Sequence, residues 1–275
     1  MSRAEPANRI AIAATTDTGR KRSHNEDNVG DDIDRGIAIV ADGMGGHKGG
    51  ATASQLAVDT ALQRLAQGLD SGVGDGDASG FSGESVLVRE AVEQSNRVIH
   101  DKAAQSPQYE GMGTTVVAAV FYEDQLSLAH VGDARAYRLR DGRLEQLTRD
   151  HTLMQELIER GFYTPEEARE SLNRNVVTRA LGIEREVQVD LQEDLALPGD
   201  LYLLCSDGLN DMLDDDTIRL TLADVSDNLT DVANSLIEQA NENGGQDNVS
   251  AVLVRVLHPV TKRRSWLRRF VDWLQ

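Results

Sequence analysis

The sequence predicts an α+β fold organised around antiparallel β-sheet. Between residues 113 and 148, four short β-rich runs follow one another with few polar residues between them. Two of these runs are joined by Asp141-Gly142, a dipeptide typical of tight hairpin turns. Long amphipathic segments lie before and after this region rather than between its strands. Strands joined directly by turns pair antiparallel, whereas a parallel sheet needs a helix between successive strands.

The expected strands are apolar, β-rich runs bounded by polar or glycine-rich segments. They are 10–16, 36–41, 113–121, 125–131, 134–139, 144–148, 187–191, 200–205 and 249–257. The run 36–41 is apolar without interruption, which indicates a buried strand. The chain's single cysteine, Cys205, ends another apolar run, so we interpret it as a buried structural thiol.

Three segments carry apolar side chains at helical spacing. The first begins after residue 50 and fades near Gly68, the second runs from about 85 to 104, and the third covers 230–243. The glycine pair at 244–245 stops the third helix.

Two connecting segments differ from the rest. Residues 68–85 are rich in Gly, Asp and Ser, a composition that predicts a flexible surface loop. Their alternating Asp and Gly residues suggest a calcium-binding loop as a less favoured alternative, because the spacing lacks the bidentate Glu and flanking helices of an EF-hand. Residues 149–182 are charged and helical in pieces, with a helix-start box at 164–167. We interpret 149–182 as a lid or substrate flap.

Composition excludes several classes of protein. The 275-residue chain has a formal net charge of −18, which makes it a poor binder of nucleic acid. A single cysteine excludes an internal disulfide and suggests a reducing compartment. With no signal peptide and no apolar run of about 18 residues, we expect a cytoplasmic protein.

Carboxylates stand at the ends of four apolar runs. They are Asp42, Asp133, Asp207 and Asp247. Glu26 and Asp27 lie just before the run that delivers Asp42. If these carboxylates gathered at one end of the fold, they would repel one another unless a divalent cation neutralised their charge. A single Asp-Gly is more often a turn, and periodicity alone does not bring the four together.

Asp42 also opens the glycine-rich loop 42–50. A carboxylate next to the unhindered carbonyl of Gly43 offers hard oxygen donors suited to Mg²⁺ or Mn²⁺. The alternative is a tight strand-to-helix turn with a capping Asp. In the polar segment 16–28, three basic residues precede Glu26, which fits either an anion-binding Arg22 or a solvated turn.

Together these segments resemble the metal-dependent serine/threonine protein phosphatases (PPM, or type 2C), within them the bacterial branch. The resemblance covers residues 9–257, with the motifs in the family's order. They are Arg22-Ser23-His24-Asn25-Glu26-Asp27, Asp42-Gly43-Met44-Gly45-Gly46, Gly113-Thr114-Thr115, Val131-Gly132-Asp133-Ala134-Arg135, Ser206-Asp207-Gly208 and Asp247-Asn248. Asp150-His151 and the block 177–182 resemble the family's flap. Each motif alone is weak evidence for the family, but the complete set is specific to it.

The resemblance implies the PPM fold, a central sandwich of two antiparallel sheets with helices on both outer faces and a flap at about 149–182. It also implies two Mg²⁺ or Mn²⁺ ions and a third, weaker one. By motif position, Asp42 would bridge two ions, with the Gly43 carbonyl on one of them. The other ligands would be Asp207 and Asp247 on the second ion, Glu26 and Asp27 through water, and Asp133 and Asp211 on the third ion with help from Asp207.

The implied activity is hydrolysis of phosphoserine and phosphothreonine in proteins, opposing a Ser/Thr kinase. A water shared by two ions would attack phosphorus as hydroxide, while Arg22 holds the phosphoryl oxygens. Two alternatives stay open: a non-catalytic phosphoprotein-binding relative, and a dedicated regulatory phosphatase of one switch protein. We expect a monomer that does not bind nucleic acid.

One position departs from the family. Met44 stands where some members carry a His, the candidate proton donor to the leaving group. A thioether cannot donate a proton. The acid is therefore expected to be a metal-bound water, or not to be a distinct residue. His47, His130 and His151 are interpreted as surface, structural or flap residues.

The C-terminal tail, residues 259–275, lies beyond the resemblance, so we expect a catalytic domain at 1–258 and a separate tail. Residues 261–275 carry five basic side chains against one Asp. Trp266, Phe270 and Trp273 share one helical face. This pattern fits peripheral contact with an anionic membrane or a partner groove, and equally a helix docked on the acidic body or a frayed end.

Overall fold

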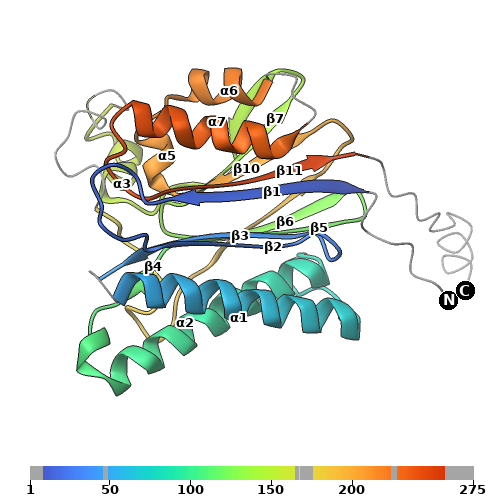
Figure 1. The fold of residues 1–275 in the computed structure, drawn as a ribbon. Coiled ribbons are helices and arrows are strands. Elements are labelled where there is room, and N and C mark those ends of the chain that lie inside the picture. Colours follow the sequence, from blue (N-terminus) through green and yellow to red (C-terminus); the bar gives the residue numbers. More distant parts are fainter. Residues whose placement is uncertain (1–8, 46–48, 165–166, 168–175, 224–227, 258–275) are drawn as a thin grey trace, which may run out of the picture.

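The protein is a sandwich of two antiparallel sheets. The computed structural model describes residues 9–45, 49–164, 167, 176–223 and 228–257. The two sheets stack face to face, and helices cover the outer face of each (Figure 1). The α+β class that the sequence predicts is therefore confirmed, as is the sandwich with helices on both outer faces that the family resemblance implies.

Each sheet joins strands that are distant in the sequence. In spatial order, the first sheet contains β1 (Ile10–Asp17), β11 (Val249–Val256), β10 (Leu201–Cys205), β7 (Arg135–Arg140) and β8 (Arg143–Gln146). The second contains β2 (Asp27–Asp32), β3 (Ile37–Met44), β5 (Val116–Tyr122), β6 (Gln125–Val131) and β9 (Asp190–Leu195). The two-residue strand β4 (Gly113–Thr114) pairs with the end of β3.

Two helices cover each sheet (Figure 1). Those on the second sheet are α1 (Gly49–Ser71) and α2 (Gly83–Gln105). Those on the first sheet are α6 (Asp215–Ala223) and α7 (Leu229–Glu242). Shorter elements connect the rest: η2 (Pro107–Tyr109), α3 (Leu153–Glu159) and α5 (Asp207–Asn210).

The alternation of side chains along β3 explains why its sequence is apolar throughout. Ile37, Ile39 and Ala41 pack toward α1 and α2, whereas Ala38 and Val40 pack between the two sheets. A strand buried on both faces reads as a continuous hydrophobic run. Packing on both faces therefore fixes the apolar part of β3, and with it the position of the polar residues that follow.

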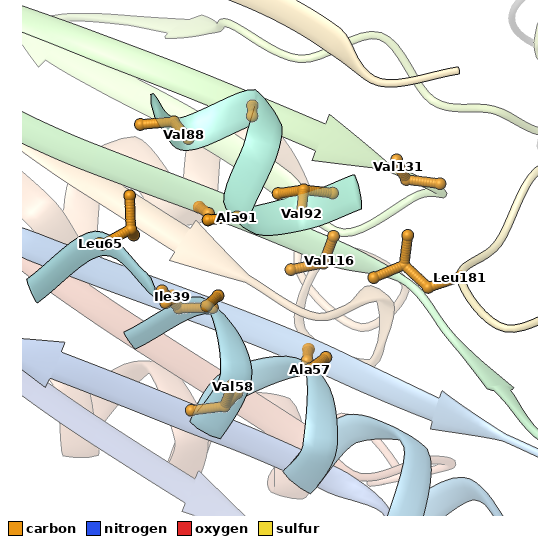
Figure 2. Packing of buried hydrophobic residues seen from close by; sticks show 14 of the residues in the cluster. Ile39, Ala57, Val58, Leu65, Val88, Ala91, Val92, Val116, Val131 and Leu181 are labelled. Carbon is orange, nitrogen blue, oxygen red and sulfur yellow. The ribbon is translucent and has the colours of Figure 1, made fainter. Parts of the chain in front are cut away.

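The core outside the second sheet is made by small and branched side chains. Figure 2 shows Ile39 of β3 with Val58 and Leu65 of α1, and Val92 of α2 near Val116 of β5. All five belong to one buried cluster. Small residues between them let the helices lie close to the sheet.

The structure differs from the prediction at β2, α6 and β9, and the short elements α5 and η2 have no counterpart in the prediction. β2 was assigned in part to a polar loop, but its pairing with β3 makes residues 27–32 a strand despite their composition. α6 was not predicted. The strand expected at 187–191 is instead β9, which begins at Asp190 and pairs with β6 along the edge of the sheet.

The loop and flap predictions are partly tested. α1 continues to Ser71 and α2 starts at Gly83, so the loop predicted at 68–85 is shorter than expected. The helix-start box is confirmed, since the backbone N–H groups of Thr164 and Glu167 each donate to the other's side chain. Residues 165–166 and 168–175, His47 and the tail after Leu257 lie outside the described residues.

Truncating Ile39 should destabilise the sandwich. Ile39→Ala removes a fully buried side chain between α1 and β3, so we expect a loss of about 2–5 kcal/mol in unfolding free energy. Ile33→Ala is a matched control, because Ile33 is 37% exposed, and should cost less than about 1 kcal/mol. Urea unfolding of both variants measures the difference, and equal losses would contradict this account of the core.

Candidate active site

The predicted site residues meet at one end of the sandwich. This is the end where β3 and β10 finish and β2 and β11 begin. A cleft of about 590 Å³ opens there. The predicted residues that line it are Arg22, Glu26, Asp42, Gly43, Asp133, Asp207 and Asp247.

Strand periodicity places Asp42 in this cleft. Side chains alternate faces along a strand, so Asp42 lies on the same face as Ala38 and Val40, between the sheets. Asp42 also faces Asp27 in the register of β2 and β3. Burial, and the neighbouring carboxylates of Asp27 and Asp207, raise the pKa of Asp42 well above its usual value.

Asp27 lies beneath the cleft. Its Oδ2 accepts hydrogen bonds from the hydroxyls of Ser206 and Ser250, both at 2.7 Å. Burial outweighs these bonds and raises the pKa of Asp27 to about 6. Ser206 follows β10 and Ser250 lies on β11, so these two hydrogen bonds connect the first sheet to Asp27 at the start of β2 in the second sheet.

Asp133 and Asp207 also line the cleft, whereas the predicted ligand Asp211 lies outside its lining, beside Asp207. Asp207 begins α5, and Asp211 follows that helix one turn later, with its N–H bonded to the Asp207 carbonyl at 2.8 Å. Burial, followed by repulsion from Asp133 and Asp211, raises the pKa of Asp207 well above its usual value. Burial and Asp150 raise the pKa of Asp133 to about 7.

These carboxylates fit divalent cations. Among the described residues, Asp27 Oδ1 and Asp207 Oδ1 are buried without a hydrogen-bond partner. An unpaired buried carboxylate oxygen is costly, and a cation would remove that cost. Carboxylates with a backbone carbonyl are the donor set that Mg²⁺ and Mn²⁺ prefer.

The backbone of Gly43 is enclosed by two other segments. A Cβ on Gly43 would lie 2.3 Å from the Gly50 carbonyl oxygen and 2.5 Å from that of Glu26. Ser54 of α1 donates to the same Glu26 carbonyl. Glycine is therefore required where the end of β3, the start of α1 and Glu26 converge.

Arg22 stands at the rim of the cleft. Its Nη2 donates to Asp247 Oδ2 at 2.6 Å, and its side chain is 55% exposed. The hydrogen bond to Asp247 raises the pKa of Arg22, so the guanidinium stays charged. A planar cation beside a group of carboxylates is positioned to hold an anion that approaches them.

A second cluster of possible ligands has another explanation. Among the described residues, the group with three ligand atoms within 4.8 Å of one another is His130, His151 and Asp190. Arg179 Nη1 lies 2.7 Å from Asp190 Oδ1 and 3.1 Å from His151 Nε2, so a guanidinium already occupies the space between them. The imidazole rings stack with centroids 4.7 Å apart. The cluster fits the structural role expected for both histidines.

The residues that support the predicted ligands have no role in the sequence-based prediction, although Ser206 and Asn248 belong to its motifs. Ser206 and Ser250 are polar residues next to or within buried apolar strands, which is the signal that could have singled them out. Asn248 was noted only as part of a motif. Its contacts could not be predicted, because its partners at residues 18–26 are more than 220 positions away.

The comparisons with known proteins agree with this site. The family model for protein phosphatase 2C matches residues 17–258. The chain belongs to that family, as the motifs indicated. The serine/threonine protein phosphatase PstP of Mycobacterium tuberculosis is 41% identical over 252 residues, which are 90% of this chain and 45% of that protein. The chain therefore spans about half the length of this relative.

Other relatives match over nearly their full length. The serine/threonine phosphatase Stp of Listeria monocytogenes is 37% identical over 250 residues, covering 87% of this chain and 93% of that protein. A crystal structure of the PstP catalytic domain in complex with two manganese ions is 40% identical, with a TM-score of 0.78 over 91% of this chain and 99% of that one. That relative, which shares the fold of this chain, therefore binds two manganese ions.

The histidine pair should make stability depend on pH. Burial, followed by His130, lowers the pKa of His151 to about 4, with Arg179 and Asp190 facing the same ring. Between about pH 6.5 and 4 the unfolded chain binds the proton more readily, so stability is lost as the pH falls.

His151→Asn should reduce this loss, because an amide can accept the hydrogen bond from the Gly132 N–H without titrating. Between pH 7 and 5, we expect the variant to lose about 1–2 kcal/mol less unfolding free energy than the wild type. Urea unfolding of both proteins in metal-free buffer measures this, and equal losses would exclude a neutral, buried His151.

Proposed function

We propose that the chain is a metal-dependent protein serine/threonine phosphatase that opposes a Ser/Thr kinase. The observation that carries the proposal is a cleft lined by Asp42, Asp133, Asp207 and Asp247 together with a charged Arg22, in which the buried Oδ1 of Asp207 has no hydrogen-bond partner. Membership of the phosphatase 2C family supports it, as do the names of the relatives. Its substrates would be phosphorylated proteins, hydrolysed by a monomer.

The ligands follow from the cleft. Asp42, the Gly43 carbonyl, Asp207 and Asp247 would hold two Mg²⁺ or Mn²⁺ ions, and Glu26 and Asp27 would orient coordinated water. Asp133 and Asp211 would hold a third ion. When bound, the ions supply an activated water and neutralise charge on the phosphoryl group. The manganese-bound relative supports this assignment.

Arg22, Met44 and the histidine pair differ in what they could contribute to the reaction. Arg22 would hold two phosphoryl oxygens and so orient the scissile bond toward the acidic end of the cleft. Met44 lines the cleft and cannot donate a proton. Burial keeps the neighbouring pair His130 and His151 neutral by lowering the pKa of each, so neither is poised to act as an acid.

Removing one carboxylate charge should abolish turnover without unfolding the protein. We expect Asp42→Asn and Asp207→Asn each to lower the rate of para-nitrophenyl phosphate hydrolysis with Mn²⁺ by more than about 100-fold, because each removes a ligand charge. The rise in thermal midpoint on adding Mn²⁺ should shrink as well.

Asp216→Asn is the matched control, since Asp216 lies on α6 with its side chain 84% exposed. A chelator should abolish wild-type activity. Near-wild-type rates in the two cleft variants would refute the site, and an inactive wild type would favour a non-catalytic relative. Phosphopeptide profiling then separates a broad enzyme from one dedicated to a single switch protein.

We further propose that residues 1–258 form the catalytic domain and that the tail, 259–275, contacts membranes peripherally. None of the described helices is long and apolar enough to cross a bilayer. Five basic residues in 261–275, together with three aromatic residues that share one helical face, support surface attachment of the tail.

Deleting residues 261–275 should abolish binding to liposomes that contain phosphatidylserine, because it removes the basic and aromatic anchors. Turnover of para-nitrophenyl phosphate should not change. Liposome co-sedimentation of the full chain and the truncated chain tests this, with phosphatidylcholine liposomes as the uncharged control. Failure of the full chain to bind would end the idea.

A further inference from the structure

The side chain of Asn248 directs all three of its hydrogen bonds to the segment that carries Arg22 and Glu26. Its Nδ2 donates to the carbonyl oxygens of Thr18 and His24, both at 2.9 Å. Its Oδ1 accepts from the Glu26 N–H at 2.8 Å. Asn248 is only 4% exposed, so these bonds are shielded from water and fix the amide in one orientation.

The turn before Asn248 holds the same segment from another side. The Gly245 carbonyl accepts from the N–H groups of Arg20 and Lys21, at 2.8 and 3.1 Å. A Cβ on Gly19 would lie 2.0 Å from the Asp247 carbonyl oxygen. The two stretches therefore pack backbone against backbone directly before Arg22.

Asn248 also touches the acidic wall of the cleft. Its N–H donates to Asp247 Oδ1 at 2.8 Å, while Arg22 binds the other oxygen of that carboxylate. Its carbonyl oxygen would lie 2.0 Å from a Cβ on Gly208, the residue after Asp207. One buried residue thus joins the Arg22 segment to the Asp247 carboxylate and packs against the residue next to Asp207.

We propose that Asn248 is a positioning residue that sets the Arg22 guanidinium over the acidic cleft and thereby determines affinity for the substrate phosphoryl group. The inference rests on the proposed phosphatase function. Arg22 is long and exposed, and an exposed ion pair contributes little order by itself. Asn248 fixes the chain at Thr18 and His24, one on each side of Arg22, which restricts where the guanidinium can reach.

Asn248→Ser tests the proposal, because it removes the amide without adding charge. With a phosphothreonine peptide and saturating Mn²⁺, we expect KM to rise by about tenfold, while kcat and the Mn²⁺ half-saturation change by less than about threefold. Asn243→Ala is the matched control, because Asn243 Nδ2 donates to the Met212 carbonyl at 3.1 Å, away from this segment. It should keep the wild-type KM.

A double-mutant cycle with Arg22→Ala separates positioning from a general structural role. If Asn248 acts through Arg22, Asn248→Ser should raise KM by less than about twofold in the Arg22→Ala background. An equal rise in both backgrounds, or an effect confined to kcat or to Mn²⁺ half-saturation, would overturn the proposal.

Should Asn248→Ser unfold below the assay temperature, the same cycle with Asn248→Asp decides, since the carboxylate still accepts from the Glu26 N–H but cannot donate to Thr18 and His24. An inactive wild type would overturn the proposed function as well. Additive effects in an active wild type would overturn only the role of Asn248.

Discussion

Mutual repulsion among buried carboxylates is the constraint on which the cleft depends. Burial raises the pKa of Asp27, Asp42, Asp133 and Asp207, and neighbouring carboxylates raise it further. Without a counter-charge, holding such groups together away from water opposes folding. Three apolar clusters, one between the sheets and one outside each, offset that cost. The same repulsion gives the cleft its affinity for cations.

The alternation of side chains along the paired strands brings the polar groups of the site together. Val40 and Asp42 share a face of β3, and Val252 and Ser250 share a face of β11. Each strand therefore changes from apolar to polar on its inner face at the same end of the sandwich. Because strand pairing fixes the register, the polar groups meet although they are far apart in sequence.

The sequence was sufficient for the fold class, for most strands and helices, and for the set of carboxylates at strand ends. It was insufficient where tertiary pairing overrides composition. The polar stretch at 27–32 becomes β2 because β3 offers it backbone partners, and Gly30 fits because a Cβ there would lie 2.5 Å from the Val58 side chain. The serines below Asp27 and the contacts of Asn248 depend on the packing of one sheet on the other, which no local pattern encodes.

The carboxylates of the cleft lie in or next to regular secondary structure, whereas Arg22 lies in a loop. Asp42 lies near the end of β3 and Asp207 starts a short helix directly after β10, so the backbone hydrogen bonds of regular elements hold both. Arg22 instead lies in a loop held by side-chain and carbonyl contacts from the turn that ends in Asn248. A loop can change length and sequence without disturbing a ladder. The Arg22 segment can therefore vary while the carboxylates proposed to hold the ions stay in place.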